Sequence, residues 1–507
     1  MVETRRWVRR TGLGVVAALL ATTPFGAGPA HAAEPAVELA GSDWLDLGGA
    51  NAAVGVVKNA AGGKVTNGTV DTASLTGAGI GVALIDSGVA PVAGLNQPGK
   101  VINGPDLSFE SQTPGLQNID TYGHGTHMAG IIAGSDPANG FEGIAPGAHL
   151  ISLKTAAYDG AVDVSQIIAA IDWVVAHRND PGLNIRVLNL SFGTDSIQPS
   201  LIDPLSFAVE TAWRKGIVVV ASTGNDGAAR VTNPASNPYV LAVGAADPNG
   251  TAARADDTVA AFSNRGNAVR HPDLIAAGRS LVSLRVPGSY IDTTYPAARV
   301  GDRLFRGSGT SQAAAVVSGS VALLLQQRPG LSPDQVKQLL IKTADPLPKP
   351  DPIGSGAGQL DIAEASALIA PLNATQVWAP ATGLGSLEAA RGTSHVADGV
   401  TGAELTGERD IFGMPWIPLT WAAVARNGKA WNGGTWNGSV WSGQAFTGTS
   451  WASATWAVVS WTGRSWAGRS WNGDSWAGRS WNGATWTGRS WNSGTWAGRS
   501  WAGRSWG

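Results

Sequence analysis

The sequence predicts a three-layer α/β domain with a mainly parallel sheet, followed by a repetitive tail. Between about residues 75 and 370 of the 507-residue chain, short continuous apolar runs alternate with longer runs of helical period. Short runs of this kind are typical of strands buried on both faces, and strands that alternate with helices form parallel sheets. After residue 411 a five-residue repeat marked by tryptophan replaces this pattern.

The clearest elements of the α/β region can be placed by residue. The expected strands are Ile80–Ile85, Arg186–Leu190, Gly216–Ser222 and Tyr239–Ala245, and the expected helices are Val164–His177, Pro204–Gly216 and Thr310–Gln327. A further helix is expected after Ser332, because Ser332 is a favourable N-cap, Pro333 suits the first turn and Gln335 completes a capping box.

Residues 1–32 have the features of a secretory signal peptide. Four arginines precede an apolar run of about ten residues, Gly12–Ala21, and Ala30–Ala32 has the small-x-small pattern of a cleavage site. A membrane span needs ~20 apolar residues, so this run is too short. We therefore expect a secreted protein with no membrane span in its mature form, and a short N-terminal or pro-segment in residues 33–74.

Composition excludes several kinds of chemistry and partner. The chain has no cysteine, so thiol catalysis and thiolate-bound zinc are excluded. Its formal net charge of -2 gives no indication of a nucleic-acid partner. Residues 412–507 differ from the rest, because they carry eight lysines and arginines and only one acidic residue, Asp474.

Three polar residues stand where chemistry is expected in a parallel sheet, at strand ends and at the starts of the following helices. Asp86 follows the strand Ile80–Ile85, His124 precedes an apolar helix, and Ser311 begins the helix Thr310–Gln327. A serine nucleophile needs a base to take its proton and a carboxylate to orient that base. Free N–H groups at the helix start can stabilise the oxyanion, and Asn225 is the candidate side-chain donor.

The motifs D-S-G, H-G-T-H and G-T-S-x-A resemble those of the subtilisin family of serine endopeptidases, peptidase S8. The resemblance covers roughly residues 75–370. It implies that Asp86 orients the base, His124 is the general base and acid, Ser311 forms the acyl-enzyme and Asn225 stabilises the oxyanion. The family usually has Met and Pro where this chain has Gln312 and Ala315; neither position transfers protons, so catalysis is still expected.

The same resemblance implies how substrates bind. It predicts protein or peptide substrates, no cofactor or metal for the chemistry, and room for structural calcium at unspecified sites. Ser191, Phe192 and Gly193 are expected to line the S1 side of the cleft and to face Ser222, Thr223 and Gly224, and the stretch Glu142–Lys154 is expected to lead into the other wall.

The tryptophan repeat suggests a role outside catalysis. Residues 371–411 show neither pattern and are expected to be a linker; in residues 412–507, most tryptophans stand five residues apart. An odd repeat puts successive tryptophans on alternate faces of a strand, and glycine disfavours helix, so short strands and turns or partial disorder are expected. Indole rings and arginines suit a cell-envelope polymer, while a spacer or self-associating tail explains the repeat equally well.

Two alternatives to a secreted endopeptidase remain open at this stage. The chain could be a surface adhesion or wall-binding protein that uses a peptidase-like domain as a scaffold, or a hydrolase that acts on esters alone. The complete set of Asp86, His124, Ser311 and Asn225 argues against a scaffold, which needs none of them. On the endopeptidase interpretation, a chain ending near Ala370 is expected to cleave soluble peptides normally.

Overall fold

The computed structural model describes residues 75–440, apart from 112, 114, 250–253, 350, 399–402 and 433, together with residues 65–66, 69–70 and 461–463. The signal peptide, nearly all of the expected pro-segment and most of the tryptophan repeat lie outside the described residues. None of the described helices is long and apolar enough to cross a membrane.

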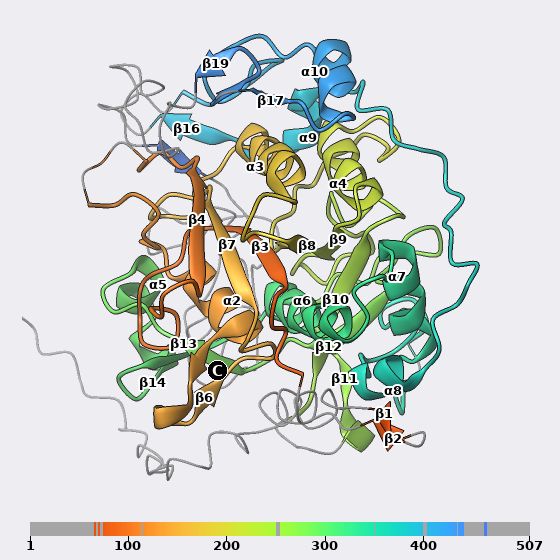
Figure 1. Cartoon of the computed structure of the whole chain (residues 1–507). Helices are drawn as coiled ribbons and strands as arrows, with labels where there is room; N and C mark the ends of the chain where they lie inside the picture. The colour runs from red at the N-terminus through yellow and green to blue at the C-terminus, as the bar shows by residue number, and fades with distance from the viewer. Residues whose placement is uncertain are drawn as a thin grey trace, which may run out of the picture. The chain divides into compact units, whose positions relative to one another are not determined.

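The main sheet has eight strands, of which seven are mutually parallel (Figure 1). The strand order is β11-β10-β9-β8-β3-β7-β4, with β12 beside β10, and only β11 runs antiparallel. The strands are β3 (Gly81–Asp86), β4 (Val101–Asp106), β7 (His149–Lys154), β8 (Ile185–Leu190), β9 (Val218–Ser222), β10 (Leu241–Asp247), β11 (Thr258–Val259) and β12 (Leu274–Ala277).

Two pairs of helices pack on the sheet and make the three layers. Helices α3 (Val164–His177) and α4 (Pro204–Arg214) pack together, and α2 (His124–Ala133) packs with α6 (Thr310–Gln327) beside the other side of the strands (Figure 1). Helix α7 (Pro333–Lys342) follows α6. Every residue of β3 and of α2 is buried, so the strand that ends with Asp86 and the helix that begins with His124 lie within the core.

Shorter elements surround this arrangement. The remaining helices are α5 (Tyr290–Thr294), α8 (Ile362–Ala367), α9 (Leu387–Arg391), α10 (Pro418–Ala425) and the 3-10 turns η2 (Pro137–Asn139), η3 (Arg254–Asp256) and η4 (Pro296–Ala298). The small sheets pair β1 (Val65–Thr66) with β2 (Thr69–Val70), β5 (Ser135–Asp136) with β6 (Phe141–Glu142), β15 (Leu304–Gly307) with β13 (Leu281–Leu284) and β14 (Arg299–Val300), β16 (Val396–Asp398) with β20 (Trp461–Gly463), and β18 (Thr435–Trp436) with β17 (Trp431–Asn432) and β19 (Ser439–Val440).

The structure confirms the expected α/β fold with its mainly parallel sheet. Helices α3 and α6 have the expected bounds. At the start of α7, the Ser332 side chain accepts from the backbone N–H of Gln335 at 3.2 Å, and the Gln335 side chain accepts from the N–H of Ser332 at 3.0 Å. The predicted capping box is therefore present.

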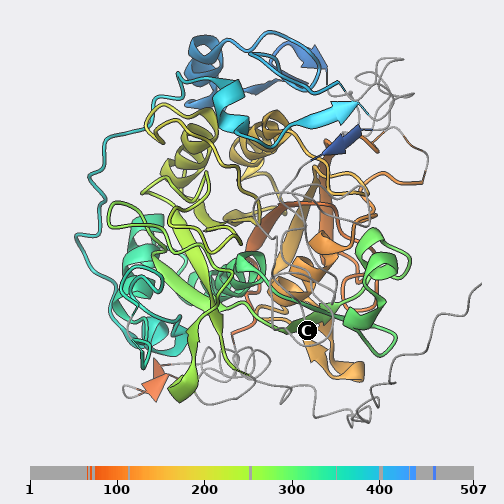
Figure 2. The ribbon, with the colours of Figure 1, turned by 180° about the vertical axis from the view of Figure 1, so that it is seen from behind.

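Residues 371–440, here called the C-terminal segment, pack on the α/β domain. Residues 371–411 are expected from the sequence to be a linker, whereas in the structure this stretch contains α9 and β16 and buries Arg391 completely. Helix α9 contacts α3 and α4, and α10 contacts α4, so the part of the segment from α9 to α10 lies over this helix pair, as Figure 2 shows from behind. The segment also buries apolar side chains such as Leu387 and Ile411, but they come from short elements without a repeating apolar pattern, which is why periodicity did not reveal these contacts.

The first units of the tryptophan repeat anchor the C-terminal segment on α3. Trp421 and Trp436 each donate an indole N–H to Oδ2 of Asp172 at 2.8 Å. Trp431 donates its indole N–H to the carbonyl of Ala169 at 2.6 Å, and lies opposite Trp436 in the pairing of β17 with β18. Burial raises the pKa of Asp172 to about 7, and the two indole N–H groups partly oppose that rise. Trp421, Trp431, Trp436 and Asp172 are here called the tryptophan clamp.

Candidate active site

Asp86 and His124 meet at the carboxyl edge of the sheet. Asp86 is the last residue of β3 and His124 the first of α2, and Nδ1 of His124 lies 2.8 Å from Oδ1 and 2.9 Å from Oδ2 of Asp86. Both side chains are buried. The glycine after His124 allows this approach, because a Cβ on Gly125 would lie 2.1 Å from the carbonyl oxygen of Gly88.

A second carboxylate, which sequence analysis missed, holds this pair in place. Ser87 Oγ donates to Asp120 Oδ1 at 2.8 Å and also lies 3.2 Å from Asp86 Oδ1. Asp120 in turn accepts from the backbone N–H groups of Gly123 at 2.6 Å and Thr126 at 2.7 Å, on either side of His124. Burial raises the pKa of Asp120, while these hydrogen bonds oppose the rise. Its position four residues before His124 is the signal that could have found it.

Ser311 and Asn225 lie together at the start of α6. Ser311 is the second residue of the helix and is 5% exposed. Asn225 Oδ1 accepts from the backbone N–H of Thr310 at 2.8 Å and from the Thr310 hydroxyl at 3.0 Å. These two bonds fix the amide of Asn225 beside the serine and leave its NH₂ group as the available donor. Helix α6 packs against α2, the helix that begins with His124.

The two stretches expected on the S1 side of the cleft follow neighbouring strands. Ser191, Phe192 and Gly193 follow β8, and the stretch Ser222 to Gly224 ends β9 and continues beyond it. The Thr232 side chain lies between them: a Cβ on Gly193 would be 2.3 Å from Thr232 Oγ1, and one on Gly224 would be 2.7 Å from Thr232 Cγ2. Ser191, Phe192, Ser222 and Thr223 are buried, whereas Gly193 and Gly224 are partly exposed.

His127 lies close to the catalytic candidates but is held as a neutral core residue. Its Nε2 donates to the carbonyl of Phe305 at 3.0 Å, and the side chain is fully buried. Burial is the main cause that lowers the pKa of His127 to about 3, and the charge of His124 adds to it. A histidine that stays neutral across the physiological range serves packing better than proton transfer.

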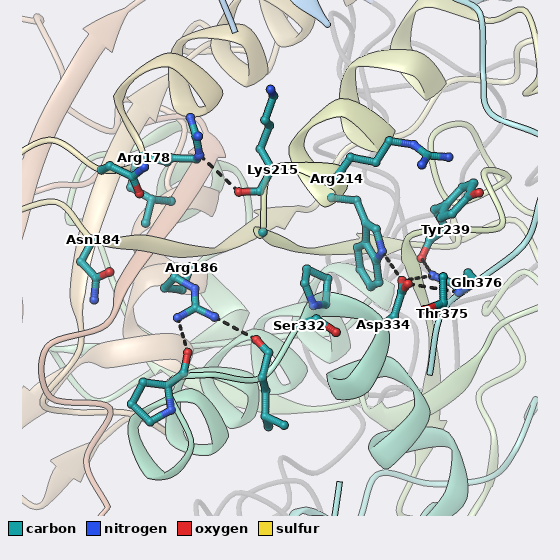
Figure 3. A pocket seen from close by; sticks show the side chains of 17 residues that line it. Arg178, Asn184, Arg186, Arg214, Lys215, Tyr239, Ser332, Asp334, Thr375 and Gln376 are labelled. Carbon is teal, nitrogen blue, oxygen red and sulfur yellow. Dashed lines mark hydrogen bonds between the residues drawn. The ribbon is translucent and has the colours of Figure 1, made fainter. Parts of the chain in front are cut away.

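A polar cavity of about 740 Å³ lies at the opposite edge of the sheet, beside the first residues of β8 (Figure 3). Arg178 donates to the carbonyls of Val175 at 2.6 Å and Lys215 at 3.2 Å, and Arg186 donates to two carbonyls beyond the end of α6. Helix C-termini gather at this edge, and cations stabilise their carbonyl ends. The cavity is separated from the catalytic edge by the length of β8, roughly 20 Å, and its arginines have a structural role.

The described residues contain one cluster of three carboxylates close enough to share a cation. Asp345, Asp361 and Glu364 have oxygens within 4.8 Å of one another. Calcium takes six to eight oxygen ligands, and Arg254 already forms an ion pair with Asp345. This cluster therefore does not fit the structural calcium that sequence analysis allows, and none of the chemistry below depends on a metal.

A parallel α/β sheet with a buried aspartate–histidine pair at its carboxyl edge, and a serine at the start of a nearby helix, defines the class of α/β serine hydrolases. Residues 77–372 match the Subtilase family, peptidase S8. The match covers more than half of the chain, and the protein belongs to this family of subtilisin-like serine endopeptidases.

Individual relatives agree with this assignment. Serine protease AprX of Bacillus subtilis is 39% identical over 298 residues, which are 57% of this chain and 66% of AprX. Subtilisin BL of Lederbergia lenta is 35% identical over 282 residues, 56% of this chain and 89% of subtilisin BL. Minor extracellular protease Epr of Bacillus subtilis is 33% identical over 271 residues, 53% of this chain but 36% of Epr. The chain thus spans about two thirds of AprX and about a third of Epr.

Proposed function

We propose that the protein is a secreted endopeptidase that cleaves peptide bonds through an acyl-enzyme formed on Ser311. The observation that carries the proposal is the buried pair of Asp86 and His124 at the carboxyl edge of the sheet. Because Nδ1 of His124 donates its proton to the carboxylate, Nε2 is the unprotonated ring nitrogen and can act as a base. A base held in one tautomer and one orientation is what a serine nucleophile requires.

In the proposed reaction, His124 Nε2 takes the proton of the Ser311 hydroxyl as its oxygen attacks the substrate carbonyl. The oxyanion that forms is stabilised by the Asn225 NH₂ group and by backbone N–H groups at the start of α6. His124 then gives the proton to the leaving amine, and the acyl-enzyme forms as the peptide bond breaks. Water, deprotonated by His124, attacks the ester, the acid product leaves and Ser311 recovers its proton.

A labelling experiment with its matched variant tests this proposal. A fluorophosphonate probe reacts with an activated serine, so the purified protein should be labelled and should digest casein. The variant Ser311→Ala should remain folded, lose labelling and lose proteolysis by up to ~10⁶-fold. Casein digestion by the alanine variant would contradict the role of Ser311. Labelling without casein digestion would favour a hydrolase of esters. The absence of both labelling and digestion would favour a scaffold.

The proposed binding of the tail to a cell-envelope polymer is restricted to the repeat units from residue 441 onward. The earlier units, Trp416 to Trp436, are buried against the α/β domain and cannot also bind a polymer through their rings. A chain ending at residue 440 should cleave soluble peptides as the full chain does but should fail to sediment with isolated cell walls. Equal sedimentation of the two chains would contradict the tether.

A further inference from the structure

Two loops leave the catalytic edge of the sheet on either side of Asp86. Strand β3 lies between β7 and β8, so residues 155–163, which follow β7, and residues 191–195, which follow β8, flank the end of β3. The first loop begins against the catalytic strand, because Thr155 donates its backbone N–H to the carbonyl of Asp86 at 2.8 Å. The second loop carries the proposed cleft wall Ser191 to Gly193. These two stretches are here called the cleft loops.

The C-terminal segment reaches the end of the first cleft loop through a buried arginine. Arg391, the last residue of α9, is 0% exposed, and its Nε donates to Oδ2 of Asp163 at 2.6 Å. Asp163 ends the loop and is the N-cap of α3, where its other oxygen accepts from the backbone N–H of Ser165 at 2.9 Å. Arg391 also donates to the carbonyl of Gly407 at 2.8 Å and to Glu388 at 3.1 Å. The position of the arginine is therefore fixed by both the loop and its own segment.

The same short stretch holds the end of the second cleft loop. Thr194 donates its hydroxyl to the carbonyl of Ala390 at 2.6 Å. Asp195 accepts from the backbone N–H and from the hydroxyl of Thr393, each at 2.6 Å. Between them, Gly392 passes so close that a Cβ there would lie 2.2 Å from Asp195 Oδ1, and its φ of 60° is one that glycine adopts without strain.

We propose that residues 386–393 form a brace that sets the separation of the two cleft loops, with Arg391 as its positioning residue. The inference rests on the proposed function, because it assumes that an extended substrate lies between the stretch Ser191 to Gly193 and the loop that follows β7. Neither loop is bonded to the other in the contacts described above; each is bonded to the brace. A planar guanidinium with several fixed donors suits this task, because it holds both the direction and the distance of its partners.

The brace acts on substrates that occupy much of the cleft. An extended peptide contacts both loops, so its binding depends on their separation, whereas a small ester needs little more than the catalytic groups. Loss of the brace should therefore raise KM for extended peptides and leave the hydrolysis of small esters nearly unchanged. A merely structural contribution of Arg391 would lower stability and affect the two substrates alike.

The test compares two kinds of variant in the full chain, each quantified by active-site titration. Arg391→Met removes the brace's ion pair, Arg391→Lys keeps the charge without the planar fork, and the double variant Thr194→Val, Thr393→Val weakens the other side. Trp421→Phe is the matched control, because it removes one hydrogen bond of the tryptophan clamp, in the same C-terminal segment and on the same helix α3, without touching a cleft loop.

We expect Arg391→Met to raise KM for an extended peptide amide about tenfold, with kcat and the kinetics of a single-residue ester changed less than about twofold. Arg391→Lys and the double variant should give smaller rises, so they decide the matter if Arg391→Met does not fold. Trp421→Phe should lower Tm with no change in the ratio of the two KM values. An unchanged ratio in the Arg391 variants and the double variant would overturn the brace. A wild-type protein that cleaves neither substrate would instead overturn the proposed function.

Discussion

The α/β domain and the C-terminal segment both bury their side chains, but by different means. Helix α6 buries sixteen consecutive residues, Thr310 to Leu325, in a continuous small and aliphatic surface. The C-terminal segment instead has short elements and buries individual polar and aromatic groups, such as Arg391 against Asp163 and two indoles against Asp172. Removal of one partner of a buried ion pair leaves an uncompensated charge and is strongly destabilising, so a single contact such as that of Arg391 with Asp163 matters to the segment.

Removal of the whole C-terminal segment should destabilise the protein more than any single substitution discussed here. In the Ser311→Ala background, which prevents self-digestion, a chain ending at residue 370 should unfold at a much lower temperature or fail to fold. It loses the partner of the buried Asp163 and the indole donors to Asp172, and removal of one buried tryptophan side chain alone typically costs ~3–5 kcal/mol.

A chain ending at residue 440 is the matched control for that truncation and should keep the Tm of the full chain within a few degrees. Thermal unfolding of the two truncated chains side by side provides the measurement. If the chain ending at 370 melts like the one ending at 440, the segment is a passive covering, and the sequence-based expectation that activity survives a cut near Ala370 is restored.

The same contrast explains how far the sequence could predict the structure. The strands and helices of residues 75–370 follow from apolar periodicity, and caps such as Ser332 fix where a helix begins. The C-terminal segment has no such period, since its contacts join residues more than two hundred positions apart, such as Asp163 with Arg391 and Asp172 with Trp421. No local pattern can report a pair of that kind.

At the candidate active site, the sequence predicted the reacting groups but not the residues that position them. Asp86, His124, Ser311 and Asn225 stand in motifs whose chemistry is recognisable. Asp120 is a lone carboxylate in the sequence, and its part emerges only when Ser87 and the start of α2 are placed beside it. Groups that react need particular residue types, whereas groups that position them need only a hydrogen bond at the right place.

Removal of the oxyanion donor Asn225 has the next largest expected effect, and it acts on catalysis within the α/β domain. Asn225→Ala should lower kcat by ~10²–10³-fold with little change in KM, the loss found when such a donor is removed from a subtilisin. Its bonds to Thr310 are lost as well, so circular dichroism should confirm that the start of α6 is intact. A normal kcat with a raised KM would make Asn225 a ground-state binding residue instead.

The smallest expected effect comes from the carboxylate of Asp172 in the tryptophan clamp. Its ionisation should make the stability contributed by the C-terminal segment depend on pH. Burial raises the pKa of Asp172 to about 7, above the value of ~3.9 in an unfolded chain. Between these pH values the folded state holds the proton more tightly, so the contribution of Asp172 to stability is largest at low pH and declines as pH rises from about 4 to about 7.

The variant Asp172→Asn tests this pH dependence, because it keeps an oxygen that can accept from Trp421 and Trp436 but cannot ionise. In the Ser311→Ala background, Tm should therefore fall less between about pH 5 and pH 8 in the asparagine variant than in the parent, by a few degrees. Parallel declines in the two proteins would mean that Asp172 ionises in the folded state as readily as in the unfolded chain, and that the indole N–H groups are sufficient to hold the carboxylate charged.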